Sequence, residues 1–178
     1  MITALDTIAI KAADLGGAAA WTERLLARPV IAGEETAAVR LDNVALDFAL
    51  ADDGTDGITG LSFEITEADA AFRACERRAL KPTAPVAFAE TDANGGLHEG
   101  RHIDLDEGAT FGVPVKLVEY AKNQLPLPRA KTIAEGAVTG LDHIVIRTTH
   151  PNRAAALYGA RLGLDMRLDR TAPTWGAR

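Results

Sequence analysis

Alternating apolar and polar positions at the start of the chain predict a strand over residues 3–11. A helix pattern follows over residues 15–27, with Asp14 as a suitable N-cap. Two shorter alternating runs then predict further strands, 36–41 and 44–50. The order in this first part of the chain is therefore a strand, a helix and then more strands.

The same order recurs after the turn-rich Asp52-Asp53-Gly54. Residues 58–65 predict a strand, and Thr66 can cap a helix over residues 67–79. Three later runs predict the strands that complete the unit: 86–89, 102–105 and 112–120. The repeat predicts one domain over residues 1–120, built from modules 1–52 and 57–120.

A third copy of the first strand begins beyond the middle of the chain. Leu141-Asp142-His143-Ile144 repeats the pattern of Leu5-Asp6-Thr7-Ile8, and Pro151 marks the first turn of another helix. The proline-rich stretch before it predicts a linker over residues 121–139. We expect residues 140–178 to start a further module that is incomplete, as in a truncated form of a longer protein.

Helical spacing also predicts which helix side chains are buried. Trp21 and Leu25 share an apolar stripe with Leu26, and Tyr158 occupies a similar position in the third unit. We expect these side chains to pack helices on sheets. Cys75 lies at helical spacing from apolar neighbours, so we expect a buried thiol rather than a reactive one.

Charge and composition exclude several classes of partner. The formal net charge is −6 without a basic run, so nucleic acid and anionic membranes are poor partners. No apolar stretch approaches the roughly 20 residues of a membrane span. No secretory signal is visible and the single cysteine cannot form an internal disulfide, so we expect a cytoplasmic protein.

Three stretches carry a resemblance to a known family: Leu141–Ile146, Ala156–Leu164 and Ala109–Glu119. They are similar to an opening strand, a helix end and a closing strand of the vicinal oxygen chelate superfamily. This superfamily includes glyoxalase I, bleomycin-resistance proteins and extradiol dioxygenases. The resemblance implies an α+β fold, in which paired βαβββ modules form a curled, cup-like mixed sheet with helices outside, plus a partial third module.

The resemblance also implies a divalent metal site in the cup, with ligands from the first and last strands of the modules. Thr7 and Gly60 occupy the positions where the paired modules usually carry histidine. Glu119 is the ligand that the closing strand offers, and His143 is the histidine of the third module. Glu119 and His143 are therefore the expected metal ligands, with Fe, Mn, Zn or Ni as the metal, unless the metal has been lost.

Glu119 is also the candidate catalytic residue, as a general base. Strand alternation places it on the more apolar face of its strand, which leaves two readings open: a side chain that faces into the cup, or one that faces solvent. A carboxylate in the cup requires a partner, a hydrogen bond or a metal.

Arg101, His102 and Asp47 are the candidate substrate-binding residues. Arg101 and His102 end the string His98-Glu99-Gly100-Arg101-His102, which matches the zinc-protease motif H-E-x-x-H. That motif requires a helix, whereas this string predicts a loop entering a strand. The two side chains either point into the cup and bind an anionic substrate, or lie at a solvated strand edge.

Three functions fit these features. The first is a metal-dependent lyase, isomerase or ring-cleaving dioxygenase that acts on a small oxygenated metabolite. The second is a metal-free module that binds a small molecule, as bleomycin-resistance proteins do. The third is a non-catalytic N-terminal scaffold domain of a longer enzyme, which best explains Thr7 and Gly60. The uncovered strand edges of the third module also predict a homodimer.

Overall fold

The computed structural model describes residues 2–91, 97–121 and 134–165. Within them, the predicted first strand, its helix and the two later strands are present, and a short strand that was not predicted follows the helix. Asp14 is the N-cap of the helix, and its side chain accepts a hydrogen bond of 2.9 Å from the backbone of Gly17. The elements are β1 (Ile2–Ala12), α1 (Leu15–Leu26), β2 (Val30–Ala32), β3 (Thr36–Arg40) and β4 (Ala45–Leu50).

The second module repeats this order. Its helix begins one residue later than the pattern predicted, and its second and third strands are longer than predicted. The elements are β5 (Gly57–Ile65), α2 (Ala68–Arg77), β6 (Val86–Thr91), β7 (Leu97–Asp104) and β8 (Val115–Tyr120). The string Asn94-Gly95-Gly96, which is typical of a turn, lies outside the described residues.

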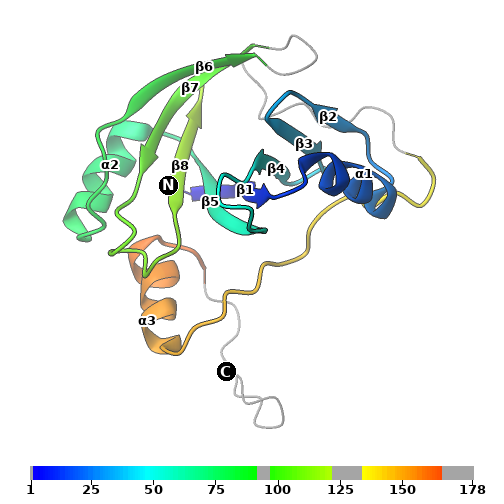
Figure 1. Ribbon diagram of the computed structural model, residues 1–178. Coiled ribbons are helices and arrows are strands. Elements are labelled where there is room, and N and C mark those ends of the chain that lie inside the picture. The colour runs from blue at the N-terminus through cyan, green and yellow to red at the C-terminus, as the bar shows by residue number, and fades with distance from the viewer. Residues whose placement is uncertain (1, 92–96, 122–133, 166–178) are drawn as a thin grey trace.

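All of these strands form one eight-stranded mixed sheet in the order β2-β3-β4-β1-β5-β8-β7-β6. Each module ends with a strand parallel to its first, β4 beside β1 and β8 beside β5. The modules meet where β1 pairs antiparallel with β5. Figure 1 shows the sheet curling into an open cup, with α2 against the outside of β6, β7 and β8. The predicted fold class is therefore confirmed.

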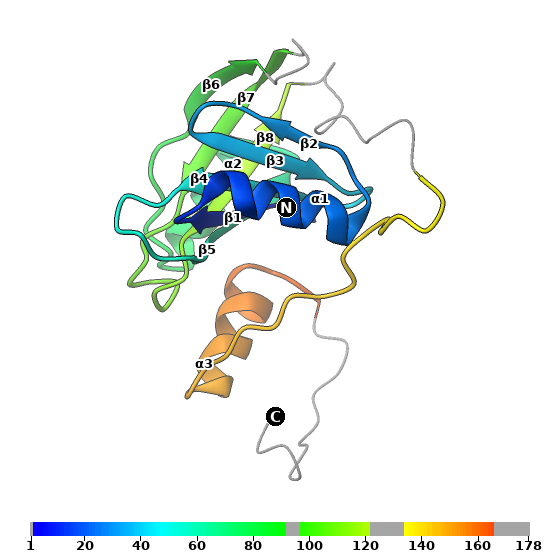
Figure 2. The same ribbon diagram turned by 45° about the vertical axis from the view of Figure 1, so that its right-hand side comes forward.

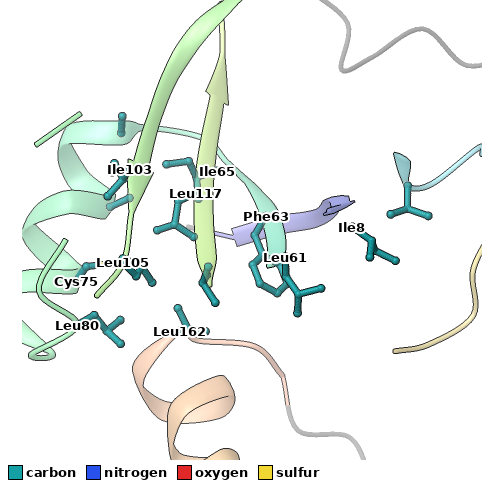
Figure 3. Close-up of a cluster of buried hydrophobic side chains, with 14 of the residues drawn as sticks. Ile8, Leu61, Phe63, Ile65, Cys75, Leu80, Ile103, Leu105, Leu117 and Leu162 are labelled. Atoms are coloured by element: carbon teal, nitrogen blue, oxygen red, sulfur yellow. The ribbon is translucent and has the colours of Figure 1, made fainter. Parts of the chain in front are cut away.

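The hydrophobic core lies between the convex face of the sheet and the helices. Figure 3 shows Ile103 and Leu117 of the sheet close to Cys75 and Leu80. These four side chains are fully buried. The prediction of a buried Cys75 is confirmed, and burial raises the pKa of its thiol, so the thiol is unreactive.

Helix α1 packs on the sheet through a different stripe from the one we predicted. Trp21 and Leu25 are 62% and 57% exposed, so the expectation that they pack on the sheet was wrong. The buried position between them is Thr22, whose hydroxyl donates a hydrogen bond of 2.7 Å to the carbonyl of Ala18. Small residues on the inner stripe bring α1 close to the strands, and Figure 2 shows α1 running along the sheet.

The third segment does not form the predicted strand over residues 141–147. Its backbone is extended but lies in no strand. Asn43 holds it instead, because its side-chain amide donates to the carbonyl of Leu141 at 2.8 Å and accepts from the Leu141 N–H at 3.0 Å. The predicted helix is confirmed as α3 (Pro151–Ala155), which continues as the π-helix η1 (Ala156–Arg161).

Helix η1 is anchored below the second module. Leu157 and Leu162 are buried in the core. Tyr158, which we predicted to pack a helix on the sheet, lies partly buried against the same core. No helix among the described residues is long and apolar enough to cross a membrane.

Candidate functional site

The concave face of the sheet carries a row of polar side chains that the pairing register defines. Directly paired residues of neighbouring strands point to the same face. Thr7 pairs with Ser62, and Gly100 pairs with Tyr120. Their side chains lie opposite to those of Ile103 and Leu117, which pack under α2. Thr7 and Tyr120 therefore face the cup.

A β-bulge adds Asp6 to this row. Leu5 pairs with Phe63 and Thr7 with Ser62, so β1 has one residue more than β5 at this point. A bulge of this kind bends the strand and redirects a side chain. The Asp6 carboxylate accepts a hydrogen bond of 2.9 Å from the Thr7 hydroxyl.

Asp6 also joins the two modules. Its other carboxylate oxygen accepts a hydrogen bond of 3.0 Å from the hydroxyl of Tyr120 at the end of β8. Burial raises the pKa of Asp6 and outweighs the hydrogen bonds from Thr7 and Tyr120, which lower it. The nearby charge of Asp47 raises the pKa further, and that of Arg40 opposes it. A carboxyl group with a raised pKa is suited to proton transfer near neutral pH.

Tyr120 is held as a neutral hydrogen-bond donor. Burial is the main cause that raises its pKa, and the adjacent negative charge of Asp6 adds to it. The ring of Phe88 lies edge-on to the Tyr120 ring, with 6.1 Å between the centroids and an interplanar angle of 84°. The phenol therefore stays protonated over the physiological pH range.

Arg40 and Asp47 form an ion pair on the same face, on the side of the first module. The guanidinium of Arg40 donates to Asp47 at 2.6 Å, and its side chain is 13% exposed. The structure thus places Asp47, a predicted substrate-binding residue, near Asp6, and its negative charge raises the pKa of Asp6.

His102, another predicted substrate-binding residue, also faces the cup. Its ring lies 6.2 Å from that of Phe88, and its Nε2 is 3.4 Å from the carboxylate of Asp104. Gly100 lies beneath Phe88, because a Cβ there would meet the ring at 2.9 Å. The whole H-E-x-x-H string lies in strand β7 rather than on a helix, so it cannot form the zinc-protease site.

Arg101 and Glu119 lie on the opposite, helix-covered face. Glu119 accepts hydrogen bonds from the Arg101 guanidinium at 2.9 and 2.7 Å, and Arg101 also donates to Asp69 of α2 at 2.9 Å. These contacts raise the pKa of Arg101. The structure therefore supports neither reading of Glu119, because its carboxylate points out of the cup and is paired with a cation.

Arg101 and Glu119 also line a cavity of about 580 Å³. Ala87 and Ala89 share its lining, and register places both on the convex face. Phe88 and Tyr120 line it as well, so the cavity extends to the edge of the row of polar side chains around Asp6.

The predicted metal ligands are not brought together. His143 is exposed, with 71% of its side chain accessible, and its Nδ1 lies 2.9 Å from the carboxylate of its neighbour Asp142. Among the described residues, no group of three or more His, Cys, Asp or Glu side chains is arranged to hold a metal ion. The donor set expected from the resemblance, Glu119 with His143, therefore does not fit a metal site in this fold.

Sequence reasoning missed Asp6 and Tyr120. The available signal was the aspartate shared by the repeated strands, Asp6 in the first copy and Asp142 in the third. We considered instead the position after this aspartate, Thr7 and His143, because the resemblance implies a metal ligand there. The bulge that redirects Asp6 has no mark in the sequence.

Two βαβββ modules in one cup-like sheet are the fold that solved methylmalonyl-CoA epimerases show, in line with the fold that the resemblance predicted. Among solved structures that show it, methylmalonyl-CoA epimerase from Mycobacterium tuberculosis is 21% identical, with a TM-score of 0.52 over 67% of this chain and 89% of that chain. A variant of the Streptomyces coelicolor epimerase in complex with 2-nitronate-propionyl-CoA is 16% identical, with a TM-score of 0.55 over 71% of this chain and 100% of that one. No protein-family profile matches the sequence. No curated protein matches it either.

Proposed function

We propose that the concave face binds a small oxygenated metabolite and that Asp6 exchanges a proton with it. The proton is one on a carbon next to a carbonyl group, which an isomerase of this kind removes and returns. The observation that carries this proposal is the partly buried Asp6 carboxyl group, which has a raised pKa and lies between two hydroxyl donors. Methylmalonyl-CoA epimerase is among the solved structures with this fold, and the choice of a proton-transfer reaction is made by analogy with it.

The proposed step needs only groups on the concave face. The carboxylate of Asp6 takes a proton from a carbon next to a carbonyl group, and the electron pair moves to the carbonyl oxygen as an enolate. Once Asp6 holds the proton, the hydroxyl of Tyr120 is free to turn from Asp6 and donate a hydrogen bond to that oxygen, and Arg40 offers a positive charge nearby. Return of the proton to the same face gives exchange alone, and an epimerisation requires the enolate to turn its opposite face toward Asp6 before the proton returns.

A second candidate is binding without turnover. Glu119, the expected ligand of the closing strand, is bound to Arg101 on the convex face, so the paired modules offer no complete ligand set among their described residues. This favours the metal-free binding module over lyase or dioxygenase chemistry. The homodimer, the divalent metal, the scaffold role and the cytoplasmic location stay predictions.

Solvent exchange separates these functions. The full chain is incubated in D₂O with methylmalonyl-CoA, and separately with a 2-oxo acid, and NMR follows loss of the proton next to the carbonyl. We expect exchange that Asp6→Asn lowers at least about 100-fold, since removal of a general base typically costs that much. Glu119→Gln should keep the activity, whereas the metal-ligand hypothesis expects a loss.

Two results would overturn the proton-transfer proposal. One is exchange that survives Asp6→Asn, which would assign the proton to another group. The other is saturable binding of these compounds without exchange, which would establish the binding module instead.

A further inference from the structure

A second cavity lies where the third segment meets the second module, away from the cup. Its volume is about 340 Å³. The lining consists of one aromatic side chain from the loop before β8 and of residues around the start of α3: Phe111, Arg147, Thr148, Thr149, His150 and Arg153.

The charge of this cavity is opposite to that of the whole chain. The formal net charge of the protein is −6, yet none of the six lining residues is acidic. The guanidinium groups of Arg147 and Arg153 form no hydrogen bond or ion pair within the described part of the chain, and the backbone N–H of Arg153 donates to the carbonyl of His150 at 3.0 Å. Two guanidinium groups without a counter-charge on one cavity attract an oxyanion, which they can bind through paired N–H donors.

Hydroxyl groups add donors for the same ligand. The Thr148 hydroxyl oxygen accepts a hydrogen bond of 3.0 Å from the backbone N–H of His150. Its own proton is therefore available to a ligand in the cavity. Thr149 contributes a second hydroxyl to the lining.

The walls of the cavity are fixed to the core. Arg161 of η1 donates to the carbonyl groups of Arg78 and Ala109 at 2.8 and 3.2 Å, and also to that of Ala79. Leu157 is buried in the same helix. These contacts hold η1, which continues α3, against the loop before β8.

Phe111 provides the apolar side of the cavity. Its φ angle is 59°, in the left-handed region that few aromatic residues adopt, and the side chain is 51% exposed. The turn thus presents an aromatic ring to the cavity instead of burying it.

We propose that this cavity binds the phosphate group of a small phosphomonoester, with the apolar part of the ligand against Phe111. The two arginines and the threonine hydroxyls take the phosphate oxygens. This proposal does not depend on Asp6 or on any reaction in the cup.

Calorimetric titration of the full chain with phenyl phosphate and with inorganic phosphate, at low ionic strength, tests the site. We expect saturable binding, tighter for phenyl phosphate. Arg147→Gln and Arg153→Gln should each weaken both ligands at least about 10-fold. Phe111→Ala should weaken phenyl phosphate and leave inorganic phosphate unchanged.

Arg73→Gln is the matched control, because Arg73 is an exposed arginine on α2 and the variant makes the same change in charge. It should bind as the unmodified chain does, and circular dichroism confirms that each variant is folded. Absence of saturable binding at millimolar phosphate would overturn the proposal. An equal loss in Arg73→Gln would also overturn it, because that loss reports only net charge.

Discussion

The hydroxyl of Tyr120 donates a hydrogen bond of 3.0 Å to the carboxylate of Asp6. This bond joins the last strand of the second module to the first strand of the first module, and β5 lies between them in the sheet. Both side chains are partly buried, and Tyr120 is the second donor to the Asp6 carboxylate beside Thr7. The hydrogen bond between Tyr120 and Asp6 therefore contributes both to the stability of the fold and to the chemistry of the cup.

Replacement of Tyr120 by phenylalanine should destabilise the fold by about 1–3 kcal/mol, because it removes a donor from a buried carboxylate. Urea unfolding measures the loss. Tyr158→Phe is the matched control, since the Tyr158 hydroxyl is buried and has no hydrogen-bond partner among the described residues. That variant should be neutral or slightly stabilising, and equal losses in the two variants would contradict the role of the Asp6 bond.

The raised pKa of Asp6 predicts a particular pH dependence. The folded state holds the Asp6 proton more tightly than the unfolded state, whose pKa is near 3.8. Its contribution to stability is therefore present below this pH and lost as the pH rises through the folded pKa. The free energy of unfolding of Asp6→Asn, relative to the unmodified chain, should increase between pH 3.5 and 7.

Asp53→Asn provides a comparison of opposite sign. The hydrogen bond from Lys11 lowers the pKa of Asp53, with Thr55 as a further donor. The Asp53 carboxylate stabilises the folded state at pH values above its unfolded pKa, and this stabilisation is lost as the pH falls. The relative stability of Asp53→Asn should therefore decrease, not increase, with rising pH. The same slope in both variants would show that the Asp6 effect has another origin.

The sequence predicted the repeated modules because each module satisfies local rules. Asp14 caps α1, and the alternation of apolar residues matches the strands. The family resemblance then supplied the pairing of the modules. The stripe of α1 could not be predicted in this way, since Trp21 and Thr22 both lie at helical spacing from other apolar residues, and only the docking of the helix decides which is buried.

The candidate site was less predictable for a physical reason. Alternation assigned Glu119 to the more apolar face of β8, and this was correct, but that face packs beneath α2 rather than lining the cup. Asp6 faces the cup only because a bulge interrupts alternation. Both errors depend on contacts between strands that are distant in the sequence.

Gly100→Ala tests the packing of the aromatic side of the cup. A Cβ at Gly100 would overlap the Glu119 carbonyl oxygen and lie 2.9 Å from the Phe88 ring, so β7 would have to shift. We expect a loss of about 2 kcal/mol or more, as for other overpacked positions. Gly57→Ala is the control, because nothing lies within 4 Å of its Cβ position. It should be neutral or stabilising in the same thermal unfolding measurement.

Asn43→Ala tests how the third segment is held on the first module. The Leu141 N–H donates to the side chain of Asn43, whereas the neighbouring Asp42 N–H donates to the carbonyl of Thr139 at 2.7 Å. Removal of the amide should speed hydrogen exchange at Leu141 at least about 10-fold. The Leu141 N–H then has no acceptor in the protein and is open to solvent. Exchange at Asp42 should change less, since Arg28 still donates to the carbonyl of Val138 at 2.7 Å and keeps the chain in place. Mass spectrometry of peptides that separate the two amides measures both rates. Unchanged exchange at Leu141 would mean that contacts other than the Asn43 amide protect this N–H.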